Sequence, residues 1–244
     1  MLVVLRDAWS TVVPDMRGRH GPLPPLLLAL TAVTGLVDAF SYLVLGHVFV
    51  ANMTGNIVFS GFAIAGAPGF SLAASLVSLG AFAAGALLGG RVAHVARAHR
   101  GRVLRLALVL ETVAVLAAFA TAAAAGDTTA DGVRYPLIML LGLGMGVQNA
   151  AARALAVPDL TTTVLTLTIT GIAADSRAAG GSGGKVGRRA LSVAAMFAGG
   201  LVGALAVRHG DPSLPLLFAA LLLSAATVAT HALTRSGGAW VAPL

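Results

Sequence analysis

The sequence predicts an all-α membrane protein with six transmembrane helices and two shorter helices that are re-entrant or broken. Of its 244 residues, 57% are hydrophobic and only 10% are charged, whereas soluble domains carry about 25% charged residues. Apolar segments of the roughly 20 residues needed to cross a bilayer recur along the chain, and short arginine-containing segments separate them. No polar stretch is long enough for a soluble domain, so we expect one membrane domain in contact with the lipid bilayer.

The chain is expected to have a cytoplasmic N-terminal segment at 1–25, a membrane domain at 26–233 and a polar C-terminal tail at 234–244. The full-length helices are predicted at about 26–45, 70–90, 103–125, 135–156, 190–207 and 213–233. Two further apolar stretches, 53–66 and 161–174, each extend only about 21 Å at a rise of about 1.5 Å per residue. These stretches are shorter than the hydrocarbon core of about 30 Å, so we predict re-entrant or broken helices there.

The distribution of basic residues indicates how many segments cross the membrane. If all eight apolar stretches crossed, the arginine-rich loop at 91–105 would lie opposite the basic N-terminus, against the positive-inside rule. With six crossings, the N-terminus, this loop, the basic linker at 176–189 and the C-terminus all fall on one side. We therefore expect six crossings with both termini in the cytoplasm.

A weak internal repeat relates two halves of the membrane domain, at about 26–125 and 134–233. The sequence GLVDA at 35–39 corresponds to GVQNA at 146–150, and NMTGN at 52–56 corresponds to DLTTT at 159–163. Each half contains three crossings, an odd number, so the halves are expected to have inverted orientations. Inverted repeats with paired broken helices are typical of transporters whose site lies at the bilayer midplane.

Polar residues gather at the ends of the predicted long helices and at the start of the two short ones. Charged and polar side chains at membrane depth are costly and tend to have a function there. The candidate substrate-binding residues are Asp38, Asn52, Thr54, Asn56, Gln148, Asn149, Thr161, Thr162 and Thr163. Asp38 and Glu111 are also candidates for coupling to a proton or another cation.

These residues also allow a purely structural interpretation. Asn and Thr are favoured at helix N-termini, where their side chains satisfy backbone N–H groups that have no partner within the helix. Asp38 could equally hold its helix against the re-entrant segment through a hydrogen bond. The two interpretations are compatible, because caps are needed wherever the backbone unwinds to form a site.

Several other classes of site have no support in the sequence. The absence of cysteine excludes disulfides, thiolate catalysis and cysteine-ligated metals. The histidines lack ligand spacing, and we expect neither a metal site nor a cofactor. The net charge of +7 is explained by the positive-inside rule, so nucleic-acid binding is not expected. No nucleophile–base pair or carboxylate cluster indicates an enzyme.

The motif stretches resemble the YoaK-like family of bacterial multi-pass membrane proteins, a domain family of unknown function. The resemblance is carried by GLVDAFSYL at 35–43, GHVFVANMTGN at 46–56 and GVQNAAARALAVPDLTTTVLTLTITG at 146–171, followed by Ala173–Asp175. It implies an integral protein of a bacterial cell envelope, here the plasma membrane. It implies no settled activity and no catalytic residues.

The leading functional hypothesis is a secondary transporter or facilitator of a small solute, with its site between the two halves. The first alternative is a non-transporting membrane module, such as a receptor or an assembly subunit, in which the polar residues form interhelical hydrogen bonds. A membrane enzyme that acts on a lipid is the less favoured alternative. The small-residue faces of the segments at 70–90 and 190–207 can pack within the molecule or against a second copy of the chain.

Overall fold

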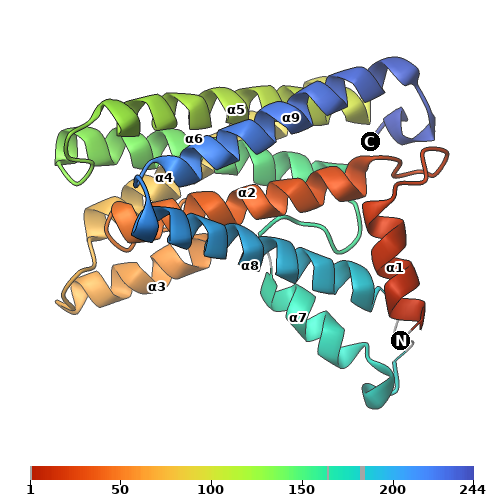
Figure 1. Ribbon diagram of the computed structural model, residues 1–244, viewed down its shortest axis with the longest axis horizontal. Helices are drawn as coiled ribbons and strands as arrows, with labels where there is room; N and C mark the ends of the chain where they lie inside the picture. Colours follow the sequence, from red (N-terminus) through yellow and green to blue (C-terminus); the bar gives the residue numbers. More distant parts are fainter. Residues whose placement is uncertain (1, 164, 182–184) are drawn as a thin grey trace.

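The computed structural model describes residues 2–163, 165–181 and 185–244, and every regular element in this part of the chain is a helix. Residue 164 of the second predicted short stretch and residues 182–184 of the basic linker lie outside the described residues. The elements, shown in Figure 1, are α1 (Leu2–Val12), α2 (Leu23–Val44), α3 (Met53–Ile64), α4 (Leu72–Val95), α5 (Arg100–Ala124), α6 (Asp131–Leu155), α7 (Leu165–Ala174), η1 (Arg177–Ala179), α8 (Val186–His209), α9 (Leu214–Ser236) and η2 (Ala239–Val241).

Six of these helices are long and apolar enough to cross a membrane, namely α2, α4, α5, α6, α8 and α9. They contain 22 to 25 residues, which corresponds to about 33 to 38 Å of helix and exceeds the hydrocarbon core. Helices α3 and α7 contain only 12 and 10 residues. The predicted fold class, an all-α membrane protein with six long and two short helices, is therefore confirmed.

Local sequence explains where several helices begin and end. Pro24 lies in the first turn of α2, where the missing N–H costs nothing and the fixed φ suits the helix. The side chain of Ser71 accepts a hydrogen bond from the backbone N of Ala74 and caps α4. Helix α6 ends at Leu155, and the φ of 49° of the next residue, Ala156, lies in the left-handed region and turns the chain away from the helix axis.

Glycines allow the closest helix packing in the bundle. Helix α2 packs against α8 and α4 packs against α6, and Figure 1 shows α2 and α8 side by side. A Cβ atom placed on Gly35 of α2 would lie 2.7 Å from the backbone N of Gly200 on α8. A Cβ atom placed on Gly146 of α6 would lie 2.7 Å from the backbone N of Ala86 on α4. Small residues at such crossings are typical of membrane helix packing.

The chain folds back on itself before each short helix. The backbone N–H groups of Val50 and Ala51 both donate to the carboxylate of Asp38 at 3.0 Å, six residues before the end of α2. In the second half, Thr163 reaches Asn149, six residues before the end of α6. The segments that lead into α3 and α7 therefore each return about 9 Å along the preceding long helix.

The outer surface of the long helices is apolar. Large hydrophobic side chains such as Val113, Phe197 and Val228 are more than half exposed on α5, α8 and α9. A soluble protein does not present such extended apolar surface to water. These faces are suited to contact with lipid chains.

Candidate functional site

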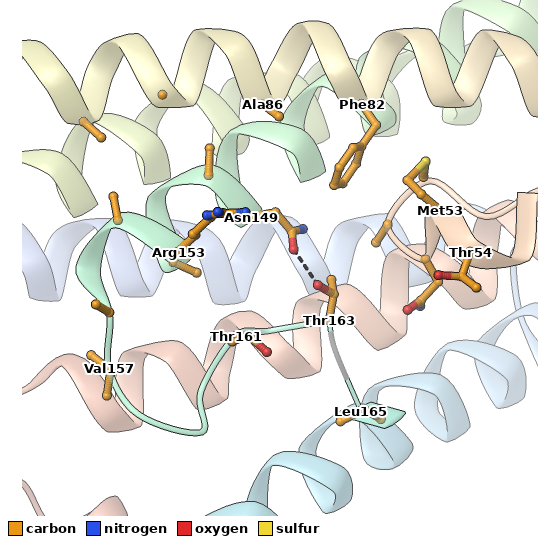
Figure 2. Close-up of a pocket in the computed structure, with 18 of the residues that line it drawn as sticks. Met53, Thr54, Phe82, Ala86, Asn149, Arg153, Val157, Thr161, Thr163 and Leu165 are labelled. Atoms are coloured by element: carbon orange, nitrogen blue, oxygen red, sulfur yellow. Dashed lines mark hydrogen bonds between the residues drawn. The ribbon is translucent and has the colours of Figure 1, made fainter. Parts of the chain in front are cut away.

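A cavity of about 1050 Å³ lies where the two short helices begin, between α3, α4, α6 and α7 (Figure 2). Five of the predicted site residues line it: Asn52, Thr54, Asn149, Thr161 and Thr163. Most of the remaining lining is apolar and comes from small residues together with Met53 and Phe82. A mainly apolar cavity with a few polar groups is typical of sites for small molecules.

Arg153, which is not among the candidate residues named from the sequence, also lines the cavity. It follows Asn149 by four residues on α6, so both side chains project from one face of the helix. This spacing was the signal in the sequence that could have placed Arg153 in the site. Arg153 takes part in none of the ion pairs formed among the described residues, and its charge is therefore available to the cavity.

Asp38 lies behind the cavity and holds the start of α3 in place. It is almost fully buried, and its Oδ1 accepts the hydrogen bonds from Val50 and Ala51. Its Oδ2 accepts a hydrogen bond from Nδ2 of Asn52. The side chain of Asn52 consequently does not cap α3. The backbone N–H groups of Met53 and Thr54 have no acceptor within the helix, because they belong to its first turn.

Asn56 is buried outside the cavity lining and fixes α3 to its surroundings. Its Oδ1 accepts from the backbone N of Phe49 at 3.0 Å, and its Nδ2 donates to the carbonyl oxygen of Phe49 at 2.6 Å. The same Nδ2 also donates to Oγ of Ser78 on α4 at 3.1 Å. Asn56 thus joins the loop, α3 and α4 in one hydrogen-bonded unit.

The second half has a comparable contact at the start of α7. Oγ1 of Thr163 donates to Oδ1 of Asn149, the bond drawn as a dashed line in Figure 2. Nδ2 of Asn149 donates to the backbone carbonyl of Met145 at 2.9 Å. Both Thr163 and Asn149 face the cavity, whereas Asp38 in the first half does not.

The remaining predicted residues, Gln148, Thr162 and Glu111, form a buried cluster with Thr34 of α2. The side-chain amide of Gln148 lies between the carboxyl group of Glu111, 2.6 Å away, and the hydroxyl group of Thr34, 2.9 Å away. Glu111 takes part in none of the ion pairs formed within the described ranges. The cluster connects α5, α6 and α2 to the segment that precedes α7.

A separate ionic cluster ties α7 to α8. Arg189 forms ion pairs with Asp159 at 2.8 Å and with Asp175 at 2.7 Å. Its Nη1 also donates to the backbone carbonyl of Gly171 at 2.6 Å. Asp159 and Asp175 therefore hold the two ends of the α7 region against α8. No group of three or more potential metal-ligating side chains occurs among the residues that the structure describes.

The fold is that of a polytopic α-helical membrane protein with a cavity at the start of two short helices. The model of the family described as "Protein of unknown function (DUF1275)" matches residues 26–229, and the chain belongs to this family. It is 37% identical over 152 residues to the UPF0700 transmembrane protein YoaK of Bacillus subtilis (strain 168). This match covers 61% of the chain and 64% of the relative, less than two thirds of its length. No solved structure matches the chain.

The comparisons confirm the resemblance to YoaK-like proteins that the motif stretches predict. Together with the six apolar helices, they support a multi-pass bacterial membrane protein.

Proposed function

We propose that this protein is a secondary transporter or facilitator that carries a small polar solute through the cavity between its two halves. The cavity at the start of α3 and α7 is the observation that carries the proposal. Its volume of about 1050 Å³ is large enough for a small molecule, since ligand pockets measure about 300–1,000 Å³. Broken helices that meet at such a site are a recurring feature of secondary transporters.

The closest helix contacts support an internal repeat. Gly146 lies 111 residues after Gly35, and the two occupy equivalent positions in α6 and α2. Gly35 packs against the backbone of Gly200, whereas Gly146 packs against that of Ala86, which lies 114 residues before Gly200. Exchange of the two halves therefore converts one contact into the other.

Two further glycine contacts follow the same rule. A Cβ atom on Gly85 of α4 would clash with the carbonyl oxygen of Leu143 on α6. A Cβ atom on Gly199 of α8 would clash with the carbonyl oxygen of Ala32 on α2. Gly199 lies 114 residues after Gly85, and Leu143 lies 111 residues after Ala32, so the two pairs are again equivalent. This agreement at single-residue level supports a pseudo-two-fold relation between the halves.

The hydrogen bonds at the short helices support the same relation. Asn52 donates to Asp38 in the first half, and Thr163 donates to Asn149 in the second. Both partners are shifted by 111 residues. Thr163, and not Asp159, is then the counterpart of Asn52. With three long helices in each half, this relation inverts one half with respect to the other, as in many transporters that work by alternating access.

The groups around the cavity favour a solute with a negative charge or strong hydrogen-bond acceptors. Arg153 supplies a positive charge without an ion-pair partner among the described residues. The free N–H groups of the first turn of α3 add donors and the positive end of a helix dipole. The amides and hydroxyls of Asn52, Thr161 and Thr163 complete the polar part of the lining.

The proposal also includes a location and an orientation. We place the protein in the bacterial plasma membrane with both termini in the cytoplasm. Six crossings put the α4–α5 connection and the α7–α8 linker on the same side as the termini. Together with the helix ends that flank them, at 91–105 and 176–189, these two connections contain eight of the 15 arginines, and cytoplasmic loops are enriched in Lys and Arg.

The experiment that tests the proposal is uptake into proteoliposomes from a pool of isotopically labelled carboxylates and amino acids. Thr54→Trp fills the cavity from an exposed, cavity-lining position on α3 and should abolish uptake. Ile57→Trp introduces the same side chain on α3 at an exposed position outside the lining and should leave uptake unchanged. Uptake no greater than into empty liposomes, or equal uptake by Thr54→Trp, would refute the proposal.

A non-transporting receptor or assembly module is the second candidate. The complete hydrogen bonding of Asp38 and Asn56 favours it, because such contacts also serve a static scaffold. The cavity lining contains no His, Asp or Glu side chain among the described residues, and a lipid-modifying enzyme has the least support.

A further inference from the structure

We propose that Glu111 is a proton-binding site coupled to the cavity through Gln148 and Thr162. This inference rests on the proposed transport function and assigns its coupling ion. The side chains of Glu111, Gln148, Thr162 and Thr34 are each at most 1% exposed. They form one hydrogen-bonded chain from α5 to the segment that lines the cavity, and Gln148 has hydrogen-bond partners in both protonation states of Glu111.

When Glu111 is ionised, the amide nitrogen of Gln148 faces it. Nε2 then donates to Oε1 of Glu111 at 2.6 Å. The amide oxygen accepts hydrogen bonds from Oγ1 of Thr34 at 2.9 Å and from Oγ1 of Thr162 at 3.2 Å. In this arrangement the Glu111 carboxylate and the Gln148 amide oxygen both accept hydrogen bonds, as buried polar groups require.

When the Glu111 carboxylate takes up a proton, the neutral carboxyl group becomes a donor. Its O–H then needs an acceptor, and rotation of the Gln148 amide brings the oxygen to face it. Nε2 now donates to Oγ1 of Thr34 at 2.9 Å, and the Thr34 hydroxyl donates to the carbonyl of Leu30 at 3.0 Å. The bond from Thr162 to the amide oxygen belongs only to the first arrangement. Proton binding at Glu111 therefore releases Thr162.

Thr162 is the residue through which this release reaches the cavity. Its φ of 64° lies in the left-handed region, which is strained for a β-branched residue. A strained backbone persists only when its surroundings hold it, and the bond to Gln148 is one such constraint. Thr161 and Thr163, on either side, both line the cavity, so the release of Thr162 changes the cavity wall.

The pseudo-two-fold relation indicates that the scaffold does not need this cluster. The counterparts of Gln148 and Thr34 lie 111 residues away in the other half. In α5 and α9, Thr112 and Thr227 bond each other and are taken as equivalent positions, so the counterpart of Glu111 is the residue before Thr227. The three counterparts of Glu111, Gln148 and Thr34 are all buried and apolar: Ala226, Val37 and Met145. The same packing is thus achieved without polar groups, which supports a function for Glu111 beyond helix association.

Other titratable groups do not contact the cluster within the described ranges. The elements packed against α5 carry such groups mainly near their ends: Asp131, Arg134, Tyr135 and Arg153 on α6, His231 and Arg235 on α9, and Arg91 and His94 on α4. On α5 itself, Arg105 lies six residues from Glu111 and contacts His231. On α2, Asp38 lies one turn from Thr34 and is occupied by its own three donors. The response of the cluster to pH is therefore assigned to Glu111.

The test measures the accessibility of the cavity wall at different pH values. Because the chain contains no cysteine, Thr161→Cys introduces a single thiol at an exposed position of the lining. Its reaction rate with a maleimide is measured in nanodiscs, with Glu111 present and in the Glu111→Gln background. The quantity compared is the reaction rate with Glu111 divided by the rate in the Glu111→Gln background. The ionisation of the thiol affects both rates equally and cancels in this ratio. We expect this ratio to change about fivefold with pH, the factor for one buried hydrogen bond of about 1 kcal/mol.

Three further variants keep the test decisive. Thr54→Cys borders the same cavity from α3 and should give a ratio that does not change with pH. Thr162→Val should abolish the pH response of the thiol at position 161, and Thr162→Ser, which keeps the hydroxyl group, should retain it. If Glu111→Gln does not fold, the comparison of Thr162→Val with Thr162→Ser replaces it.

A ratio for Thr161→Cys that stays constant with pH, or one that Thr54→Cys reproduces, would overturn the assignment. The same is true of an equal pH response in Thr162→Val and Thr162→Ser. None of these measurements needs a transported solute, so a failure of uptake in proteoliposomes refutes the transport proposal separately.

Discussion

Replacement of Asp38 should show how strongly the start of α3 depends on a single carboxylate. Asp38 accepts hydrogen bonds from two backbone N–H groups, those of Val50 and Ala51, and both residues are buried. Asp38→Leu leaves these two donors without an acceptor, at a cost of about 1–3 kcal/mol each. We therefore expect the free energy of unfolding to fall by about 2–6 kcal/mol.

Asp38→Asn is the matched variant, because its amide oxygen can still accept from Val50 and Ala51. The amide of Asn52 can turn its oxygen towards the new amide nitrogen, so the contact with Oδ2 is replaced. Charge-assisted hydrogen bonds become neutral ones, and the burial of a charge is relieved at the same time. The expected net loss of stability is about 1–2 kcal/mol.

The assay is equilibrium unfolding of the purified variants in mixed micelles, followed by circular dichroism. The predicted order of stability is wild type, Asp38→Asn and then Asp38→Leu. If Asp38→Leu is as stable as Asp38→Asn, the two backbone N–H groups have other partners, and the hydrogen bonds to Asp38 do not hold the start of α3 in place.

The remaining predictions concern the glycine contacts between the halves. Gly146→Ala places a Cβ atom 2.7 Å from the backbone N of Ala86 and should lower the free energy of unfolding by about 1–3 kcal/mol through overpacking. Gly80→Ala on α4 meets no atom within 4 Å and should raise stability by up to about 1 kcal/mol through helix propensity. Gly35→Ala should resemble Gly146→Ala, and the double variant should lose more stability than either, because Gly35 contacts α8 and Gly146 contacts α4. Thermal unfolding in micelles measures all four variants, and equal stability of Gly146→Ala and Gly80→Ala would contradict the packing described for α4 and α6.

Much of the fold could be predicted from the sequence because it depends on local properties. Segment length and hydropathy distinguish the six long helices from the stretches at 53–66 and 161–174, and the structure has short helices within both. The same reasoning identified polar residues such as Asn52, Thr54 and Asn149 as unusual for membrane depth, and these line the cavity. Their individual roles in binding stay predictions.

What the sequence left undetermined depends on contacts between distant segments. Glu111 and Gln148 lie on different helices, and no local pattern brings them together before α5 packs against α6. The contacts also favour another counterpart for Asn52 under the proposed repeat, whereas matching letters align NMTGN at 52–56 with DLTTT at 159–163. A gapless comparison of 35–52 with 146–163 pairs Asn52 with Thr163, as the contacts with Asp38 and Asn149 do.

The most direct measurement of the central proposal is the accessibility of one cavity residue from both sides of the membrane. Thr54→Cys provides a single exposed thiol in the lining, and it can be treated with an impermeant reagent in right-side-out and in inverted vesicles. A protein that alternates access to the cavity should react in both, whereas Ile57→Cys, on the outer face of α3, should react in neither. Reaction of Thr54→Cys from one side only would contradict transport through this cavity.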